Sequence, residues 1–381
     1  MTYLDHAAST PMRPEAVEAM LPFLVDHPGN PSGGHAVARE AKTALEEARE
    51  RVAGLLGRAP SEIVFTGGGT EADNLAVKGV ARSNAGALVV SAFEHKGVLA
   101  PARRLGQEGR SVHEIPVRPD GLVDLGALES LLDGSTALVS VMAVNNEIGT
   151  VQPVTEIAAL VHERAPRSVF HTDAVQAVPW LDVASVTSPC DLVSISAHKF
   201  GGPKGVGVLV VREGVRIAAE IEGGGQERGL RSGTVNVAGA VALAEALSVT
   251  VARRQEDVAR VAVLRDRLAD GLAAAIPDAF VNGDPAHKVA GSLHVGFPGV
   301  ESEALLLMLD QRGVCAAAGS SCSSGATEPS HVLEAIGLSR TDALASIRLS
   351  LGYSSTDADV DHALEVIPDA VARLRRAQAV A

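Results

Sequence analysis

Short apolar runs and amphipathic stretches alternate along the first two thirds of the chain. The apolar runs predict strands at 62–66, 87–91, 136–144, 168–172, 191–195 and 206–211. Apolar residues at helical spacing predict helices at 14–25, 36–56, 95–108 and 153–164. This order of elements is typical of an α/β protein with a mostly parallel central sheet and helices on both of its faces.

The pattern changes after residue 231. A long helical region spans 236–276, and a short strand at 292–297 is followed by helices at 301–312 and 358–375. We therefore predict a large domain over 14–253 and a smaller α+β C-terminal domain over 254–381, which the N-terminal segment 1–13 joins.

Composition and charge narrow the classes of function. The net charge of −13, without a long basic run, excludes direct non-specific binding of nucleic acid. No apolar run approaches the length of a membrane span, and the N-terminus lacks a signal-peptide pattern. The three cysteines have neither metal-ligand spacing nor disulfide-framework density, so we expect no metal, a reducing compartment and a cytoplasmic location.

Lys199 is the most informative candidate. It follows the strand that begins at residue 191 and precedes a Gly-Gly-Pro turn at 201–203. Burial of a lysine in a tight loop would lower the pKa of its amine and suit it to a Schiff base or to proton transfer. The alternative is an ordinary solvated loop lysine.

Other candidates also follow predicted strands, where a mostly parallel sheet places its ligand site. Three glycines before Thr70 suit a single phosphate at a helix N-terminus, although they also suit a plain turn. Asp173 is suited to hold a protonated ring nitrogen, with Gln176 on a ring substituent, or it caps the next helix. His95 is suited to stack on a ring or to move protons, or it simply begins a helix.

Two candidates lie in the C-terminal third. Cys322 occupies a run of tiny polar residues, where nothing requires a cysteine for packing, which favours an exposed reactive thiol. Arg348 stands in an apolar alternation, where it needs an anion, either a substrate carboxylate or an internal acidic partner. We interpret Cys190 and Cys315 as small packing residues.

Together these residues resemble the cysteine desulfurases, in the class V aminotransferase family of fold-type I pyridoxal-phosphate (PLP) enzymes. The similar motifs cover nearly the whole chain in one order. They are 3–10 (YLDHAAST), 68–71 (GGTE), 94–96 (EHK), 144–149 (VNNEIG), 171–176 (HTDAVQ), 197–205 (AHKFGGPKG), 224–228 (GGQER), 231–234 (RSGT), 319–323 (GSSCS) and 328–330 (EPS).

The resemblance implies a role for each cofactor residue. Lys199 would carry PLP as a Schiff base, and Asp173 would pair with the pyridine nitrogen. Gln176 would bond the ring oxygen, while His95 would stack on the ring and move a proton. The phosphate region would be held by Gly69, Thr70, Ser196 and His198. Thr234 would reach the phosphate of the neighbouring subunit, which implies a homodimer.

The resemblance also implies the substrate and the product. Arg348 and Asn30 would bind the carboxylate of L-cysteine, and Asn146 would contact the ring near the substrate. Cys322 would take the sulfur as a persulfide and release L-alanine. The sulfur would then pass to an acceptor protein for iron–sulfur cluster assembly or for thiolation of tRNA or DNA.

Two kinds of rival remain. Another class V enzyme, such as a selenocysteine lyase, an aminotransferase or a kynureninase-like hydrolase, would not in every case need the thiol of Cys322. A nucleotide-binding or sulfur-carrier platform without catalysis would be colourless, because it would not bind PLP.

Overall fold

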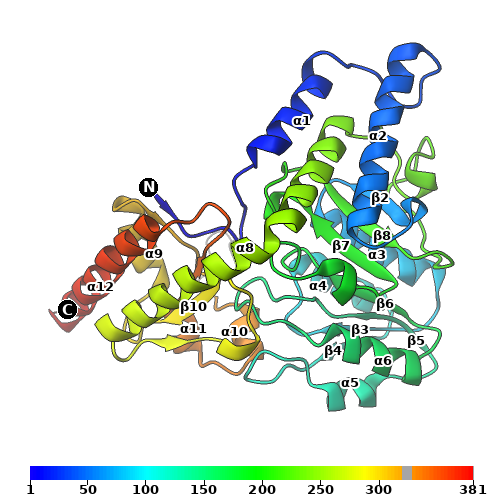
Figure 1. Ribbon diagram of the computed structural model, residues 1–381. Coiled ribbons are helices and arrows are strands. Elements are labelled where there is room, and N and C mark those ends of the chain that lie inside the picture. Colours follow the sequence, from blue (N-terminus) through cyan, green and yellow to red (C-terminus); the bar gives the residue numbers. More distant parts are fainter. Residues whose placement is uncertain (320–327, 381) are drawn as a thin grey trace.

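The computed structural model describes residues 1–319 and 328–380, and its largest feature is a sheet (Figure 1). Within the described residues, seven strands form this sheet in the order β2-β8-β7-β6-β5-β3-β4. The strands are β2 (Ile63–Thr66), β3 (Ala87–Ser91), β4 (Val112–Ile115), β5 (Thr136–Ser140), β6 (Val169–Asp173), β7 (Leu192–Ser196) and β8 (Gly207–Val211). Neighbours pair in parallel except around β8, which is antiparallel to β7 and β2. The mostly parallel sheet is therefore confirmed.

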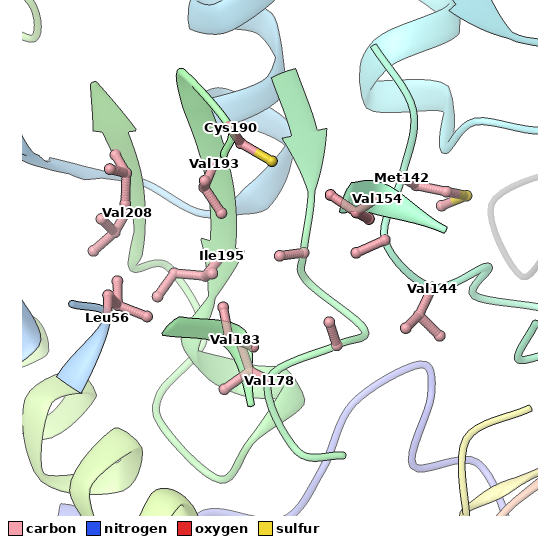
Figure 2. Close-up of a cluster of buried hydrophobic side chains, with 14 of the residues drawn as sticks. Leu56, Met142, Val144, Val154, Val178, Val183, Cys190, Val193, Ile195 and Val208 are labelled. Atoms are coloured by element: carbon pink, nitrogen blue, oxygen red, sulfur yellow. The ribbon is translucent and has the colours of Figure 1, made fainter. Parts of the chain in front are cut away.

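Helices pack on both faces of this sheet because successive side chains of a strand point to opposite sides. In β8, Val208 and Val210 belong to one buried cluster, whereas Leu209 and Val211 belong to another. Figure 2 shows the first cluster, in which the strand residues Ile195 and Val208 lie near Leu56. The helices that contribute to it include α2 (Ala36–Leu55), α5 (Leu125–Leu131), α6 (Val154–Arg164), α7 (Val183–Val186) and the first half of α8 (Val237–Ala275). The opposite face is covered by α3 (Gly69–Ser83) and α4 (Lys96–Gln107).

A further buried cluster, here called the small core, lies on the left of Figure 1. It takes side chains from Leu4, from α8 after residue 260, and from β10, α9, β12 and α12. The antiparallel order β12-β10-β9 makes its sheet. The bounds are β9 (Phe280–Val281), β10 (Ser292–Gly296), α9 (Ser302–Gln311), β12 (Ser346–Ser350) and α12 (Asp357–Val380).

The N-terminal segment belongs to the small core and continues toward the large sheet. Strand β1 (Thr2–Tyr3) pairs in parallel with β11 (Val314–Cys315), and Asp5 bridges to Ser350. Helix α8 passes without interruption through the expected boundary between residues 253 and 254, so that division stays a prediction. The remaining helices are α1 (Pro14–Val25), α10 (His331–Ala335) and α11 (Arg340–Leu344).

Two strands of the large sheet differ clearly from the expectation. The strand expected over 136–144 ends at Ser140, and the following residues bond irregularly along β6, with the Ala143 N–H donating to the Asp173 carbonyl at 2.9 Å. Strand β4 was not predicted, because its two central residues are polar. The structure shows that these two residues are exposed on a strand at the edge of the sheet. Within the described part of the chain, no helix combines the length and the apolar character needed to cross a membrane.

Candidate active site

A cavity of about 520 Å³ lies at the carboxyl ends of β2, β6 and β7, beside the N-terminus of α3. Its volume is ordinary for a small-molecule site, and its position is the one expected for a mostly parallel sheet. Ten of the predicted site residues line it: Gly69, Thr70, His95, Asn146, Asp173, Gln176, Ser196, His198, Lys199 and Arg348.

Lys199 reaches the cavity from a single 3₁₀ turn, Ala197–Lys199, that directly follows β7. Its Nζ donates hydrogen bonds to the carbonyl oxygens of Ala7 at 2.6 Å and Ala8 at 2.9 Å. The hydroxyl of Thr10 also donates to the Lys199 carbonyl at 3.2 Å. The N-terminal segment therefore holds the lysine at both its backbone and its amine.

Asp173 ends β6 and is almost fully buried. The Val175 N–H donates to its Oδ1 at 2.8 Å, which fixes the carboxyl group at the cavity wall. Burial raises the pKa of Asp173, while His95 and Lys199 lower it. A cationic group in the cavity would therefore stabilise the ionised form of this acid. Gln176, one turn further on, donates to the Ala7 carbonyl at 2.8 Å.

His95 is the N-cap of α4, so the helix that was predicted from residue 95 begins one residue later, at Lys96. Its Nδ1 accepts a hydrogen bond from the Gly97 N–H at 3.0 Å, so Nε2 carries the proton in the neutral ring. Burial is the main cause that lowers the pKa of His95. A neutral imidazole at the cavity wall suits stacking against an aromatic ring.

The turn between β2 and α3 leaves no room for side chains. A Cβ added at Gly69 would lie 2.9 Å from Val175 Cγ2 and 3.3 Å from Ser196 Cβ, and Gly68 has a φ of 147°. The first N–H groups of a helix such as α3 have no partner within the helix, and the helix dipole favours an anion there. This end of the cavity therefore suits a phosphate group.

Arg348 enters the cavity from β12 of the small core, opposite the large sheet. Its Nη1 donates to the Asn146 carbonyl at 2.9 Å, and its Nη2 donates to Asp5 Oδ1 at 2.8 Å. Its Nε is buried without a hydrogen-bond partner. Because the guanidinium still has unused donors, it is able to bind a carboxylate in the cavity.

Two described residues among the predictions, Asn30 and Thr234, do not line this cavity. Asn30 is exposed, and its side chain accepts a hydrogen bond from the Ser32 N–H at 3.0 Å. Thr234 is also exposed, on the turn after η3 (Glu227–Gly229). Cys322 lies outside the described residues. The roles of all three stay predictions.

The two described cysteines behave as packing residues. Cys190 is fully buried, and burial raises the pKa of its thiol to about 12, which leaves little thiolate at neutral pH. Cys315 is half-buried in β11 and forms no disulfide.

Several ionisable residues that line or support the cavity were not among the predicted site residues. Asp73, Glu147 and His331 line it, while Glu94 lies directly behind it with no exposed surface. Asp73 is three residues after Thr70 on α3, and Glu94 is next to His95, so their sequence positions were the available signal. Asp73, Glu94 and Glu147 are almost completely buried, and no sequence pattern indicated this burial.

Comparison with known proteins now adds the family. The class V aminotransferase family model matches residues 2–363. The IscS-like cysteine desulfurase of Mycobacterium tuberculosis is 46% identical over 387 residues, which cover 99% of this chain and 98% of that protein. The chain belongs to the cysteine desulfurases of the class V aminotransferase family.

Solved structures of desulfurase relatives share the fold. A structure titled NifS-like protein superposes with a TM-score of 0.92 at 36% identity, covering 98% of this chain and 99% of that one. A second, titled SspA in complex with cysteine, has a TM-score of 0.82 at 34% identity and covers 93% of this chain and all of that one. The expected fold-type I architecture is thereby confirmed.

As a class V desulfurase the protein is a PLP-dependent enzyme, and the cavity fits PLP. The buried carboxyl of Asp173 faces a space where a protonated ring nitrogen would offset its burial. The glycine cradle at Gly69 accepts a phosphate, and the Lys199 amine lies in the same cavity. When bound, PLP supplies an electron sink that stabilises negative charge on the Cα of an amino acid.

Proposed function

We propose that this protein converts L-cysteine to L-alanine and transfers the sulfur to its own Cys322. The single observation that carries the proposal is the shared cavity, which brings the Lys199 amine, the Asp173 carboxyl and the Arg348 guanidinium together. These three groups supply the link to the coenzyme, the partner of its ring nitrogen and a binding site for an amino-acid carboxylate.

On the coenzyme side, Lys199 would hold PLP, and its amine would take the proton from the substrate Cα. Asp173 would keep its negative charge toward the ring nitrogen, while Gln176 would bond the ring oxygen. His95 would stack on the ring. The phosphate would be bound by Gly69, Thr70, Ser196 and His198, all of which line the same cavity.

On the substrate side, Arg348 binds the carboxylate of L-cysteine through the donors that Asp5 and Asn146 leave unused. The relative solved in complex with cysteine supports this choice of substrate. We assign Asn30 as a second carboxylate contact and the side chain of Asn146 as a contact near the ring. The fixed guanidinium orients the substrate so that its Cα faces Lys199.

The transfer of sulfur to Cys322 needs no reactant besides L-cysteine and the Cys322 thiolate. The thiolate of Cys322 forms a bond to the substrate sulfur as the carbon–sulfur bond of cysteine breaks, and protons return to the carbon, so that alanine leaves. The enzyme then carries a persulfide on Cys322. That persulfide passes to an acceptor protein, for iron–sulfur cluster assembly or for thiolation of tRNA or DNA.

The proposal extends to assembly and location. Thr234 lies in an exposed turn, five residues beyond η3, where it is available to a neighbouring subunit in a homodimer. Arg231 in the same turn is bound by Glu71 at 2.8 Å, which places this turn beside the phosphate end of the cavity. A reducing, cytoplasmic location agrees with the free thiols of Cys190 and Cys315.

The test is a comparison of the wild-type enzyme with two cysteine variants. We expect the purified protein to be yellow, to release alanine from L-cysteine and to carry a trapped persulfide. Cys322→Ala should stay yellow but release alanine more slowly, by on the order of 100-fold or more. Cys315→Ala is the matched control and should retain activity. Full alanine release by Cys322→Ala would overturn the proposal and favour a rival that does not need this thiol, such as a selenocysteine lyase.

A further inference from the structure

Asp73 is a buried acid for which the proposed reaction has no use. It lies in the first turns of α3, has 1% of its surface exposed, and still lines the wall of the cavity. Its Oδ1 is buried without a hydrogen-bond partner. A carboxyl group in this state is costly unless it has a partner or remains un-ionised.

The immediate neighbours of Asp73 are two of the proposed coenzyme contacts. Single atoms of Asp73, His95 and Asp173 all lie within 4.8 Å of one another. A Cβ added at Gly97 would lie 2.7 Å from Asp73 Oδ2 and 3.0 Å from His95 Nδ1. The missing side chain at Gly97 therefore makes room for both groups to reach the back of the coenzyme site.

The charges around Asp73 do not favour its ionisation. Burial raises its pKa most, followed by the carboxyl group of Asp173; a hydrogen bond with Ser194 lowers it, and the carboxyl group of Glu94 raises it. His171 Nε2 lies 3.8 Å from Asp73 Oδ1, but burial lowers the pKa of His171 to about 3, so it remains neutral. The two nitrogens of His171 are also occupied, by Ser140 Oγ at 2.8 Å and by Ser194 Oγ at 3.0 Å.

Two carboxyl groups this close in a dry site do not both ionise. The proposed function requires the negative charge on Asp173, because that residue faces the ring nitrogen. We propose that Asp73 is a positioning residue that stays un-ionised beside Asp173, so that Asp173 alone carries negative charge toward PLP. With Asp73 un-ionised, the negative charge of Asp173 meets no repulsion from a second carboxylate beside it, and Asp73 itself touches neither substrate nor reacting atoms.

This inference rests on the proposed role of Asp173, and it predicts different PLP affinities for two substitutions of Asp73. Asp73→Asn keeps the shape and the neutral charge, whereas Asp73→Ala removes both the hydrogen-bond donor and the volume. We expect Asp73→Asn to bind PLP within about threefold of the wild-type affinity and Asp73→Ala to bind it about tenfold or more weakly. The measurement is a titration of each apoenzyme with PLP, followed by its visible absorbance. Equal losses of affinity in both variants would overturn the inference, because Asp73 would then act as an anion.

An infrared measurement reads the proton directly and does not depend on activity. Near neutral pH, the holoenzyme should show the carbonyl band of an un-ionised carboxyl group that disappears in Asp73→Asn. Glu94→Gln is the matched control, because it removes a different buried acid and should leave that band in place. If Asp73→Asn removes no such band, the inference fails.

Asp173→Asn distinguishes a failure of the proposed role of Asp173 from a failure of the inference about Asp73. It should weaken PLP binding and change the pH dependence of the visible band, because it removes the charge that faces the ring nitrogen. An unchanged affinity and spectrum in Asp173→Asn would overturn the proposed role of Asp173 and, with it, the reason for a neutral Asp73.

Discussion

The cavity has two walls that are built in different ways. The coenzyme wall consists of Gly69, Thr70, His95, Asp173, Gln176, Ser196, His198 and Lys199, which lie at strand ends and helix starts of the large sheet. The substrate wall consists of Arg348 on β12 with Asp5 and the Asn146 carbonyl, which come from three separate parts of the chain. One wall is the edge of a single sheet, whereas the other exists only where the small core meets that sheet.

This difference has a physical consequence for each wall. The coenzyme wall is stiffened by buried hydrogen bonds between neighbouring strand ends, such as those from Met142 N–H and Ser91 Oγ to the carboxyl group of Glu94 at 2.6 and 2.5 Å. The substrate wall depends on one ion pair, between residues 343 positions apart, and on one hydrogen bond to the Asn146 carbonyl. Damage to the first should remove the coenzyme chemistry, while damage to the second should mainly weaken substrate binding.

The largest expected effect comes from Lys199→Ala in the coenzyme wall. We expect alanine release to fall on the order of 1,000-fold or more, because both the covalent hold on PLP and the base are lost. The measurement combines alanine release with the visible absorbance of the bound coenzyme. Lys42→Ala, on the exposed face of α2, is the control and should behave as wild type. Turnover by Lys199→Ala close to the wild-type rate would show that the two walls have been assigned wrongly.

A smaller but more selective effect is expected from Arg348 in the substrate wall. Arg348→Ala should lower kcat/KM for L-cysteine by at least about 30-fold, because it removes the carboxylate donors and leaves Asp5 unpaired. The yellow colour and the PLP affinity should persist. Arg348→Lys keeps the charge but loses the planar fork, so it should recover only part of the KM.

If either Arg348 variant instead lost PLP without a change in KM, the division into two walls would be wrong. Steady-state kinetics and a PLP titration on the same preparations distinguish these results.

The sequence predicted the coenzyme wall much better than the substrate wall. In a parallel sheet, strand order and direction place residues such as Asp173 and Lys199 at one edge, so their positions after apolar runs were sufficient. The partner of Arg348 was left open between a substrate and an internal acid, and the structure shows that Asp5 is such an acid. No periodicity connects residues that are far apart in sequence, so this pair had to be seen in the fold.

The same limit applies to the buried acids. Asp73 lies two residues after the motif at 68–71, and Glu94 is the first residue of the motif at 94–96. Their burial, however, depends on the packing of α3, β3 and α4 against one another. The sequence shows that an acid is present, and only the packed structure shows that its charge is unfavourable. The opposite holds for Cys322. Its reactivity is predicted from the small polar residues that surround it in the sequence, without any information from packing.

Asp5→Asn tests the support of the substrate wall with a milder change. The amide keeps the shape and the hydrogen bond to Arg348 but loses the charge, so the guanidinium is held less firmly. We expect KM for L-cysteine to rise about fivefold, a loss of about 1 kcal/mol, with kcat and PLP affinity nearly unchanged. The matched control is Asp278→Asn, which breaks a surface pair with Arg375 and should leave KM unchanged. A wild-type KM in Asp5→Asn would mean that Arg348 is positioned by packing alone.

The smallest effect tests whether the coenzyme wall is dry. Burial raises the pKa of Glu94 to about 8 from 4.5, so between these values the folded protein holds a proton that the unfolded chain has released. The contribution of Glu94 to the free energy of unfolding therefore falls as the pH rises through this window.

Glu94→Gln does not titrate and lacks that contribution. At the low end of the window its stability should lie within about 1 kcal/mol of wild type, and toward the upper end it should become relatively more stable. Denaturant unfolding of the PLP-loaded proteins across the window measures the difference, and Glu163→Gln, on an exposed side chain, should follow the wild-type curve. Parallel curves for Glu94→Gln and wild type would mean that water reaches Glu94, and the contrast between a rigid, dry coenzyme wall and a substrate wall held by one ion pair and one hydrogen bond would then no longer hold.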